Sequence, residues 1–292
     1  MPKATVIIPT HDHASTLPMT IASVQRQYEQ DFEVVIIGDG VTDELRQVAR
    51  ECEKSDSRIT FLDLPKGPHH GDTYRDAVIR ESKSENIFYL CDDDLLLRSH
   101  LSNLLQLLET KDFVQSRNGY IHVDQSIHIF PTDLSKPEFI EWHLREPHRN
   151  AVSLTGTAHR KSTYSELPVG WESPAGNEWT DHFMWKKFFR LPGLKAATHP
   201  EMTAIQLPTS IERESVGLAE RAAELKIWFD RFSKEEAEVN FQQEVALATS
   251  NQLNYVYARA TDLLIDLVAL ESKCDELQNE NDLLKSQRKS LP

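Results

Sequence analysis

Residues 87–94 read Ile-Phe-Tyr-Leu-Cys-Asp-Asp-Asp, an apolar run that ends directly in three aspartates. The run predicts a buried strand, and the triplet places several negative charges where that strand leaves its sheet. Clustered carboxylates repel one another unless a positive charge lies beside them. A hard divalent cation is the usual partner, because Mg²⁺ and Mn²⁺ prefer carboxylate oxygens. The alternative is a solvated acidic turn that happens to follow a strand.

The chain before this stretch alternates strand and helix patterns. Apolar or β-branched runs lie at residues 4–8, 32–37, 59–62 and 86–90, with helical spacing between them. This alternation predicts an α/β fold, with a parallel sheet and helices on its faces. Ligands of open α/β sheets bind beyond the carboxyl ends of the strands. We therefore expect the acidic triplet at a ligand site that carries phosphate chemistry.

Charge and composition exclude several classes of protein. The 292 residues carry a formal net charge of −14, so nucleic acid and anionic membranes are not expected partners. Three scattered cysteines fit neither a disulfide framework nor a zinc site, which favours a reducing compartment. No apolar run approaches the ~20 residues of a transmembrane span, and no signal peptide precedes the first strand. We expect a cytoplasmic protein, with peripheral association at the inner face of the membrane left open.

The last third of the chain has a different character. Between Gly217 and Pro292 it contains neither glycine nor proline, and helix-forming residues dominate. A heptad register runs through it, with one position occupied by Leu253, Ala260, Leu267, Cys274 and Asn281. The other position is occupied by Val256, Leu263, Leu270, Leu277 and Leu284. This narrow seam predicts a coiled coil.

Residues 251–288 are therefore expected to join copies of the chain into a homo-oligomer, a parallel dimer first and a trimer second. Asn281 is a polar residue at a seam position, and such a residue can fix the register and the number of strands. The alternative is a long helix that packs on its own domain.

Four segments of the first half occur in an order that is typical of a known family. They are Val6–Asp12 in the first strand, Val34–Asp43 in the second, Gly71–Ala77 with its arginine, and Tyr89–Asp94 with its DxD-type triplet. Together they resemble glycosyltransferase family 2, well over residues 3–110 and more loosely to about 210. The resemblance implies a GT-A (Rossmann-like) fold with a mixed, mainly parallel sheet. It also implies a nucleotide-diphosphate sugar donor, UDP-linked in our expectation, and Mn²⁺ or Mg²⁺ as cofactor.

The resemblance also implies roles for single residues on the nucleotide side. Thr10 and Asp12 would line the nucleotide pocket, and Asp39 would accept a hydrogen bond from the base. Arg75 would lie near the nucleotide or its diphosphate. Two alternatives stay open: Asp39 could stabilise a turn between two glycines, and Arg75 could be a surface residue of an amphipathic helix.

The same resemblance distributes the metal and sugar contacts. Asp94 would bind the metal. Asp92 would contact ribose or sugar hydroxyls or share the metal, and Asp93 could take either role. His199 could supply a late metal ligand, although a lone histidine is more often structural. Cys91 stands where many relatives have another aspartate.

An inverting transfer also needs a base that takes the proton of the acceptor hydroxyl. In the family this carboxylate lies in an acidic segment before a helix, and residues 176–182 fit that description. Asp181 is the expected base and Glu178 the alternative. Helix capping by Thr180 or Asp181 is the competing interpretation.

Two tryptophans lie in or near the same segment. Trp179 and Trp185 could offer an apolar platform to a sugar ring, although packing in the core is the commoner fate of tryptophan.

These features together predict a metal-dependent, inverting glycosyltransferase. Its acceptor would be a glycan or lipid-linked glycan of a bacterial surface polysaccharide. Residues 1–210 would form the catalytic domain, 211–250 a helical extension and 251–292 the coiled coil.

Two other functions remain as alternatives. A nucleotidyltransferase would commonly carry a Gly-rich basic loop where this chain has Pro9–Asp12. A non-catalytic sugar-nucleotide-binding scaffold, assembled by the coiled coil, would not need every acidic position.

Overall fold

The computed structural model describes residues 1–176 and 178–289. They belong to two compact units, Met1–Val245 and Ala246–Pro292. Asn177, from the segment expected to carry the base, lies outside the described residues, as do residues 290–292 at the end of the expected coiled coil. The three-part division expected from the sequence stays a prediction.

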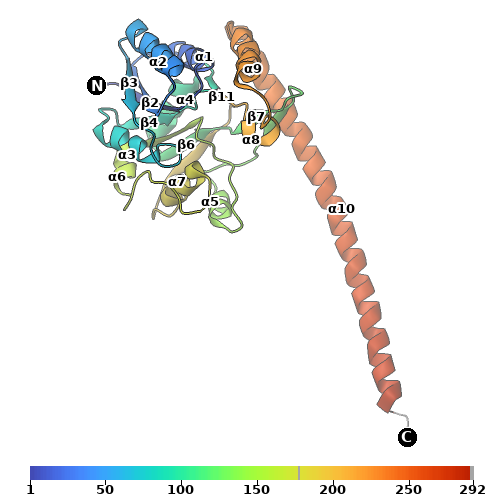
Figure 1. Ribbon diagram of the computed structural model, residues 1–292. Helices are drawn as coiled ribbons and strands as arrows, with labels where there is room; N and C mark the ends of the chain where they lie inside the picture. Colours follow the sequence, from blue (N-terminus) through green and yellow to red (C-terminus); the bar gives the residue numbers. More distant parts are fainter. Residues whose placement is uncertain (177, 290–292) are drawn as a thin grey trace. The chain divides into compact units, whose positions relative to one another are not determined.

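A seven-stranded sheet forms the centre of the first unit (Figure 1). Its strands are ordered β10-β6-β9-β4-β1-β2-β3. In chain order, they are β1 Ala4–Thr10, β2 Phe32–Asp39, β3 Ile59–Leu64, β4 Asn86–Tyr89, β6 Phe113–Ser116, β9 Thr157–Arg160 and β10 Ala196–His199. Strand β9 runs antiparallel to β4 and β6, and the other neighbours are parallel. The predicted mixed, mainly parallel sheet is confirmed.

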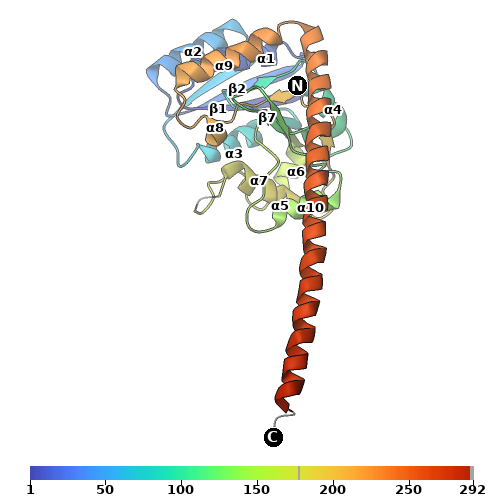
Figure 2. The ribbon, with the colours of Figure 1, turned by 90° about the vertical axis from the view of Figure 1, so that its right-hand side faces the viewer.

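Helices cover both faces of this sheet (Figure 2). One face carries α1 Leu17–Gln25, α2 Asp43–Ser55 and α4 His100–Leu108. The other carries α3 Asp72–Glu81, α6 Lys161–Ser165 and α7 Thr180–Phe189. Each face of the sheet carries its own apolar core, and alternate residues of a strand point into opposite cores. Val6 and Ile8 point into the core under α1, α2 and α4, and Ile7 points into the other. Each such buried side chain contributes roughly 1.5–3 kcal/mol to folding.

A third apolar cluster lies beside the sheet and includes two C-terminal helices. Trp228 of α9, Phe232 directly after that helix and Phe241 of α10 pack there with Leu95 and Met202. The elements not yet named are β5 Leu95–Leu96, β7 Gly119–Ile121, β8 Ile127–Ile129, β11 Ala204–Ile205, α5 Pro137–Leu144, α8 Thr209–Glu212, α9 Leu218–Arg231 and α10 Glu235–Lys289. This packing anchors the C-terminal half of α9 to the first unit.

The parallel register brings three strand ends to one edge of the sheet. Thr10 at the end of β1 lies opposite Gly38 of β2, and Ile7 of β1 lies opposite Tyr89 at the end of β4. The residues that follow β1, β2 and β4 therefore meet at this edge, as the sequence predicts for the acidic triplet.

The second unit is helical throughout its described part. The leucines of the predicted seam are exposed in the single chain: Leu263 is 56%, Leu270 64% and Leu277 55% accessible. An apolar row of this length is costly in water, which supports the predicted coiled coil. Within the described residues, no helix has both the length and the apolar character needed to span a bilayer.

The seam makes a prediction about oligomeric state. Replacing Leu263 and Leu270 together by glutamate puts charges into the seam, so the chain should fall to a smaller oligomer in light scattering. The variant should keep its nucleotide affinity, because both substitutions lie in the second unit. An unchanged mass would refute the coiled coil.

Candidate active site

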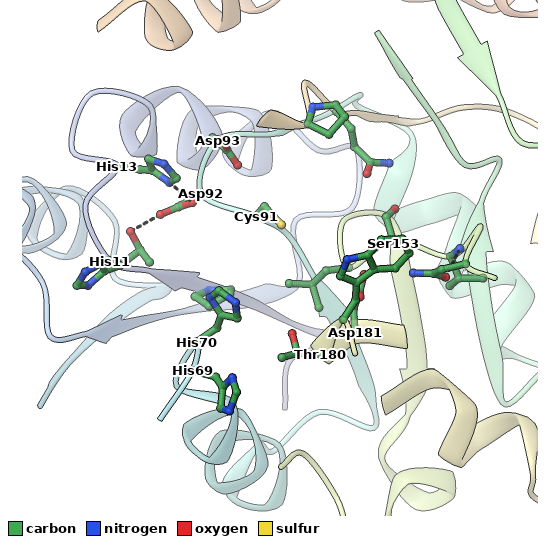
Figure 3. Close-up of a pocket in the computed structure, with 18 of the residues that line it drawn as sticks. His11, His13, His69, His70, Cys91, Asp92, Asp93, Ser153, Thr180 and Asp181 are labelled. Carbon is green, nitrogen blue, oxygen red and sulfur yellow. Dashed lines mark hydrogen bonds and ion pairs between the residues drawn. The ribbon is translucent and has the colours of Figure 1, made fainter. Parts of the chain in front are cut away.

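A cavity of about 1120 Å³ opens at the carboxyl ends of β1, β2 and β4 (Figure 3). Its wall continues along the β7–β8 hairpin and the segment that leads into α7. Asp94 and His199 are outside the lining, whereas the other predicted site residues belong to it: Thr10, Asp12, Asp39, Arg75, Asp92, Asp93, Glu178 and Asp181. The fold thus brings together residues that were expected on both the donor and the acceptor side.

Asp92 is held by Thr10, at the end of β1, and by His13, in the loop that follows. The Thr10 hydroxyl donates to Asp92 Oδ2 at 2.5 Å, and His13 Nδ1 lies 2.7 Å from Asp92 Oδ1 (Figure 3). From α1, the Thr20 hydroxyl donates to the backbone carbonyls of Asp92 and Asp94 at 3.0 and 2.9 Å. The loop carrying the triplet is therefore fixed by β1 and α1, and is not a solvated turn.

The other two aspartates have partners from more distant segments. Asp94 is buried and accepts a hydrogen bond from the Thr155 hydroxyl, which itself accepts from the backbone N–H of Cys91 at 2.9 Å. Asp93 lines the cavity and forms an ion pair with Arg221 of α9. Neither Thr155 nor Arg221 belongs to a motif that the sequence reveals.

Burial and crowding perturb the acidic triplet. Burial, and then the charge of Asp92, raises the pKa of Asp93. Burial, and then the charge of Asp93, raises the pKa of Asp94 well above its usual value. Burial lowers the pKa of His13, but the hydrogen bond and charge of Asp92 outweigh it and bring this pKa to about 9. The raised pKa values of Asp93 and Asp94 mean that the negative charge of these two carboxylates is not fully offset within the protein.

The triplet offers suitable groups for a divalent cation. Ligand atoms of Cys91, Asp93 and Asp94 lie within 4.8 Å of one another, and so do those of His13, Asp92 and Asp93. A bound Mn²⁺ or Mg²⁺ would relieve the repulsion between the carboxylates of Asp93 and Asp94, whose pKa values are raised. The residues present therefore fit such an ion, with Asp93 and Asp94 as its oxygen donors.

Asp39 and Arg75 shape the wall near β2 and α3. Asp39 accepts the Gly67 N–H at 2.6 Å and pairs with Lys66, so it orders the loop before α3. Arg75 is 4% exposed, and its guanidinium lies 4.6 Å from the Trp171 ring centroid. The alternative of a surface arginine is therefore wrong.

Some of the N–H groups of Arg75 have hydrogen-bond partners within the protein, and one does not. Its Nη1 donates to Asp72 at 2.8 Å, while its buried Nε lacks a hydrogen-bond partner among the described residues. A buried, unpaired donor in the wall of a cavity suits an anionic ligand.

The two candidate bases differ in their surroundings. Burial raises the pKa of Asp181, in the first turn of α7, to about 6, and its Oδ1 accepts the N–H of His182 at 2.7 Å. Glu178 instead forms an ion pair with Lys186, which is itself buried, and lies 3.6 Å from His182 Nδ1. The carboxylate of Glu178 is thus held by a fixed cation, whereas Asp181 titrates close to neutral pH.

The remaining candidates are His199 and the two tryptophans, Trp179 and Trp185. His199 ends β10, where its Nδ1 accepts the N–H of Glu201 at 3.3 Å. Trp185 is fully buried in the second core, so it cannot be a sugar platform. Trp179, by contrast, is 63% exposed and lines the cavity.

Comparison with known proteins agrees with this geometry. Residues 5–166, more than half of the chain, match the family described as Glycosyl transferase family 2. The chain belongs to glycosyl transferase family 2. The match ends before Asp181, α9 and α10, so these parts are not covered by the family assignment.

Two curated relatives are similar over shorter segments. A GalNAc(5)-diNAcBac-PP-undecaprenol beta-1,3-glucosyltransferase of Campylobacter jejuni is 30% identical over 42% of this chain and 37% of its own length. The poly(ribitol-phosphate) beta-N-acetylglucosaminyltransferase TarP of Staphylococcus aureus is 32% identical over 36% of this chain and 32% of its own length. Each similarity spans well under half of the relative.

Solved structures share the fold. S. aureus TarS 1–349 in complex with UDP-GlcNAc has a TM-score of 0.57 at 15% identity, over 77% of this chain and 66% of that chain. The mannosyltransferase PcManGT from Pyrobaculum calidifontis, in complex with GDP-Man and Mn²⁺, has a TM-score of 0.52 at 15% identity, over 85% of this chain and 81% of that chain. At this identity the likeness shows the GT-A-like fold alone.

The contacts of Thr155 predict a stability effect. Thr155→Val removes the hydroxyl and leaves the Cys91 N–H and the Asp94 carboxyl without that partner. The free energy of unfolding should fall by about 2 kcal/mol, as for other buried polar groups left unpaired. Urea unfolding followed by tryptophan fluorescence measures this. Thr261→Val, at an exposed position of α10, is the control, and equal midpoints for the two variants would contradict the role of Thr155.

Proposed function

We propose that this chain is a metal-dependent, inverting glycosyltransferase that transfers a sugar from a UDP-linked donor to a hydroxyl of a glycan or lipid-linked glycan. The observation that carries the proposal is that one cavity is lined both by Asp92 and Asp93, from the triplet suited to a divalent cation, and by Asp181, whose pKa is about 6. The cation would stabilise the leaving diphosphate, and the base would take the proton of the attacking hydroxyl.

The donor would occupy the side of the cavity formed by β1, β2 and β4. Thr10, Asp12 and Asp39 line this side, together with Lys66 and the loop before α3. The buried, unpaired Nε of Arg75 would meet negative charge of the donor. The UDP-GlcNAc in the TarS complex supports a UDP-linked donor, although PcManGT, with the same fold, was solved with GDP-Man.

The acceptor would enter from the side of Trp179 and the β7–β8 hairpin. The cavity has apolar side chains against which a sugar ring could stack, namely Trp179, Tyr120, Phe130 and Ile211. One curated relative is named for a PP-undecaprenol-linked glycan and the other for poly(ribitol-phosphate). These names favour a glycan of a bacterial surface polysaccharide as the acceptor.

In the proposed reaction, Asp181 takes the proton of the acceptor hydroxyl while that oxygen attacks the anomeric carbon. The bond from the anomeric carbon to the diphosphate breaks, and the diphosphate leaves with the bonding electrons. Attack in line with the departing group inverts the configuration. A bound Mn²⁺ or Mg²⁺ at Asp93 and Asp94 would neutralise the charge of the leaving group. Asp92 stays fixed by Thr10 and His13 and faces the donor hydroxyls.

Glu178 has a supporting place in this scheme. Its ion pair with Lys186 keeps one oxygen occupied next to Asp181. We therefore assign the proton transfer to Asp181 and the positioning of the segment before α7 to Glu178.

Substitution of Asp181 tests the proposal. Asp181→Asn removes the base and should lower kcat by about 10²- to 10⁴-fold, the usual contribution of a general base. Glu178→Gln is the matched comparison and should lower kcat by no more than about tenfold. UDP release from a panel of UDP-sugars with Mn²⁺ measures both. Full activity of Asp181→Asn with a donor that the wild type uses would refute the assigned base.

The pKa of Asp181 also predicts the pH dependence. The base acts only when ionised, so kcat/KM should fall tenfold per pH unit below about 6 and level off above it. A pH profile of UDP release from pH 4.5 to 8 measures this. A profile that stays flat between pH 5 and 7 would contradict a base of this pKa.

A further inference from the structure

Arg221 reaches the acidic triplet from a helix outside the matched family segment. Its Nη2 donates to Asp93 Oδ2 in an ion pair, and its Nη1 lies 3.1 Å from His13 Nε2. Only 13% of the Arg221 side chain is exposed, against 20% for Asp93. Arg221 lies in the first turn of α9, whose other end is anchored by Trp228 in the third apolar cluster. The guanidinium is thus held on the triplet by packing as well as by charge.

The protein already supplies one permanent cation, Arg221, to the three aspartates. Arg221 pairs with Asp93 and His13 Nδ1 lies 2.7 Å from Asp92, while the neutral hydroxyl of Thr155 donates to Asp94. Asp93 is also common to the two groups of ligand atoms that could hold a metal near the triplet. A divalent cation that uses Asp93 would therefore meet the guanidinium of Arg221, and two positive charges at that separation repel.

We propose that Arg221 is the resident counter-ion of Asp93 and that an incoming divalent cation displaces it. This inference rests on the proposed role of the triplet in metal binding. Without a donor, the cation must compete with the Arg221–Asp93 ion pair, so it binds weakly. A donor adds the negative charge of its diphosphate, which favours the divalent cation and leaves Arg221 free to turn from Asp93. Occupancy of the donor site is thereby coupled to the start of α9.

The competing explanation is a permanent ion pair that only fixes α9 to the domain. In that case the removal of Arg221 would weaken the packing of α9 and leave the affinity for Mn²⁺ unchanged. The two explanations therefore differ in metal affinity, which can be measured without any turnover.

The test is the binding of Mn²⁺ to the full chain without nucleotide, followed by the electron paramagnetic resonance of free Mn²⁺. Arg221→Gln should bind Mn²⁺ about tenfold more tightly than the wild type, because a charge-assisted ion pair no longer competes. Lys226→Gln is the matched control, since Lys226 lies on the same helix in an exposed ion pair with Asp230 and its loss changes the net charge equally. Its affinity should stay within about twofold of the wild type. Equal or weaker binding by Arg221→Gln would overturn the inference.

A measurement on the wild type removes any dependence on the folding of the variant. Mn²⁺ with UDP should increase amide hydrogen exchange in residues 218–224 of α9 relative to UDP alone. Unchanged or slower exchange there would also overturn the inference. No binding of Mn²⁺ to any of the three proteins, even with UDP, would instead refute the metal site of the proposed function, and this inference with it.

Discussion

The repulsion among Asp92, Asp93 and Asp94 is the constraint on which the site depends. Three adjacent carboxylates at the end of a buried strand are stable only where other groups offset their charge. Side chains from separate segments of the chain contact these carboxylates: Thr10, His13, Thr155 and Arg221. Because burial still raises the pKa values of Asp93 and Asp94, the offset is incomplete, and a cation with its anionic ligand would complete it.

The fold explains why these groups meet. Parallel pairing of β1 with β2 and β4 places three strand ends at one edge, and α7 brings Asp181 to the same cavity. The lining of the cavity is mixed in chemistry, with charged side chains such as Asp92 and Lys66 and aromatic ones such as Trp179 and Tyr120. A single cavity with this lining suits both the anionic donor and the glycan acceptor of the proposed reaction.

Much of this arrangement could be predicted from the sequence, because it depends on local patterns. Alternating strand and helix runs predict the sheet, and polar residues directly after apolar runs predict its functional edge. Arg221 could not be predicted, since its partner lies 128 positions away and only the packing of α9 joins them. Trp179 and Trp185 look equivalent in sequence, but Trp185 falls on the buried face of α7 whereas Trp179 precedes the helix. Arg75 likewise packs against the ring of Trp171, a contact between distant segments that local patterns do not reveal.

The central claim is that the acidic triplet binds a divalent cation together with the diphosphate of a nucleotide sugar. A crystal structure of the protein with UDP and Mn²⁺, using the anomalous signal of manganese, tests it most directly. The account predicts a manganese peak in contact with carboxylate oxygens of Asp93 or Asp94 and with the diphosphate. UDP bound away from the triplet, or with no manganese beside those aspartates, would contradict the account.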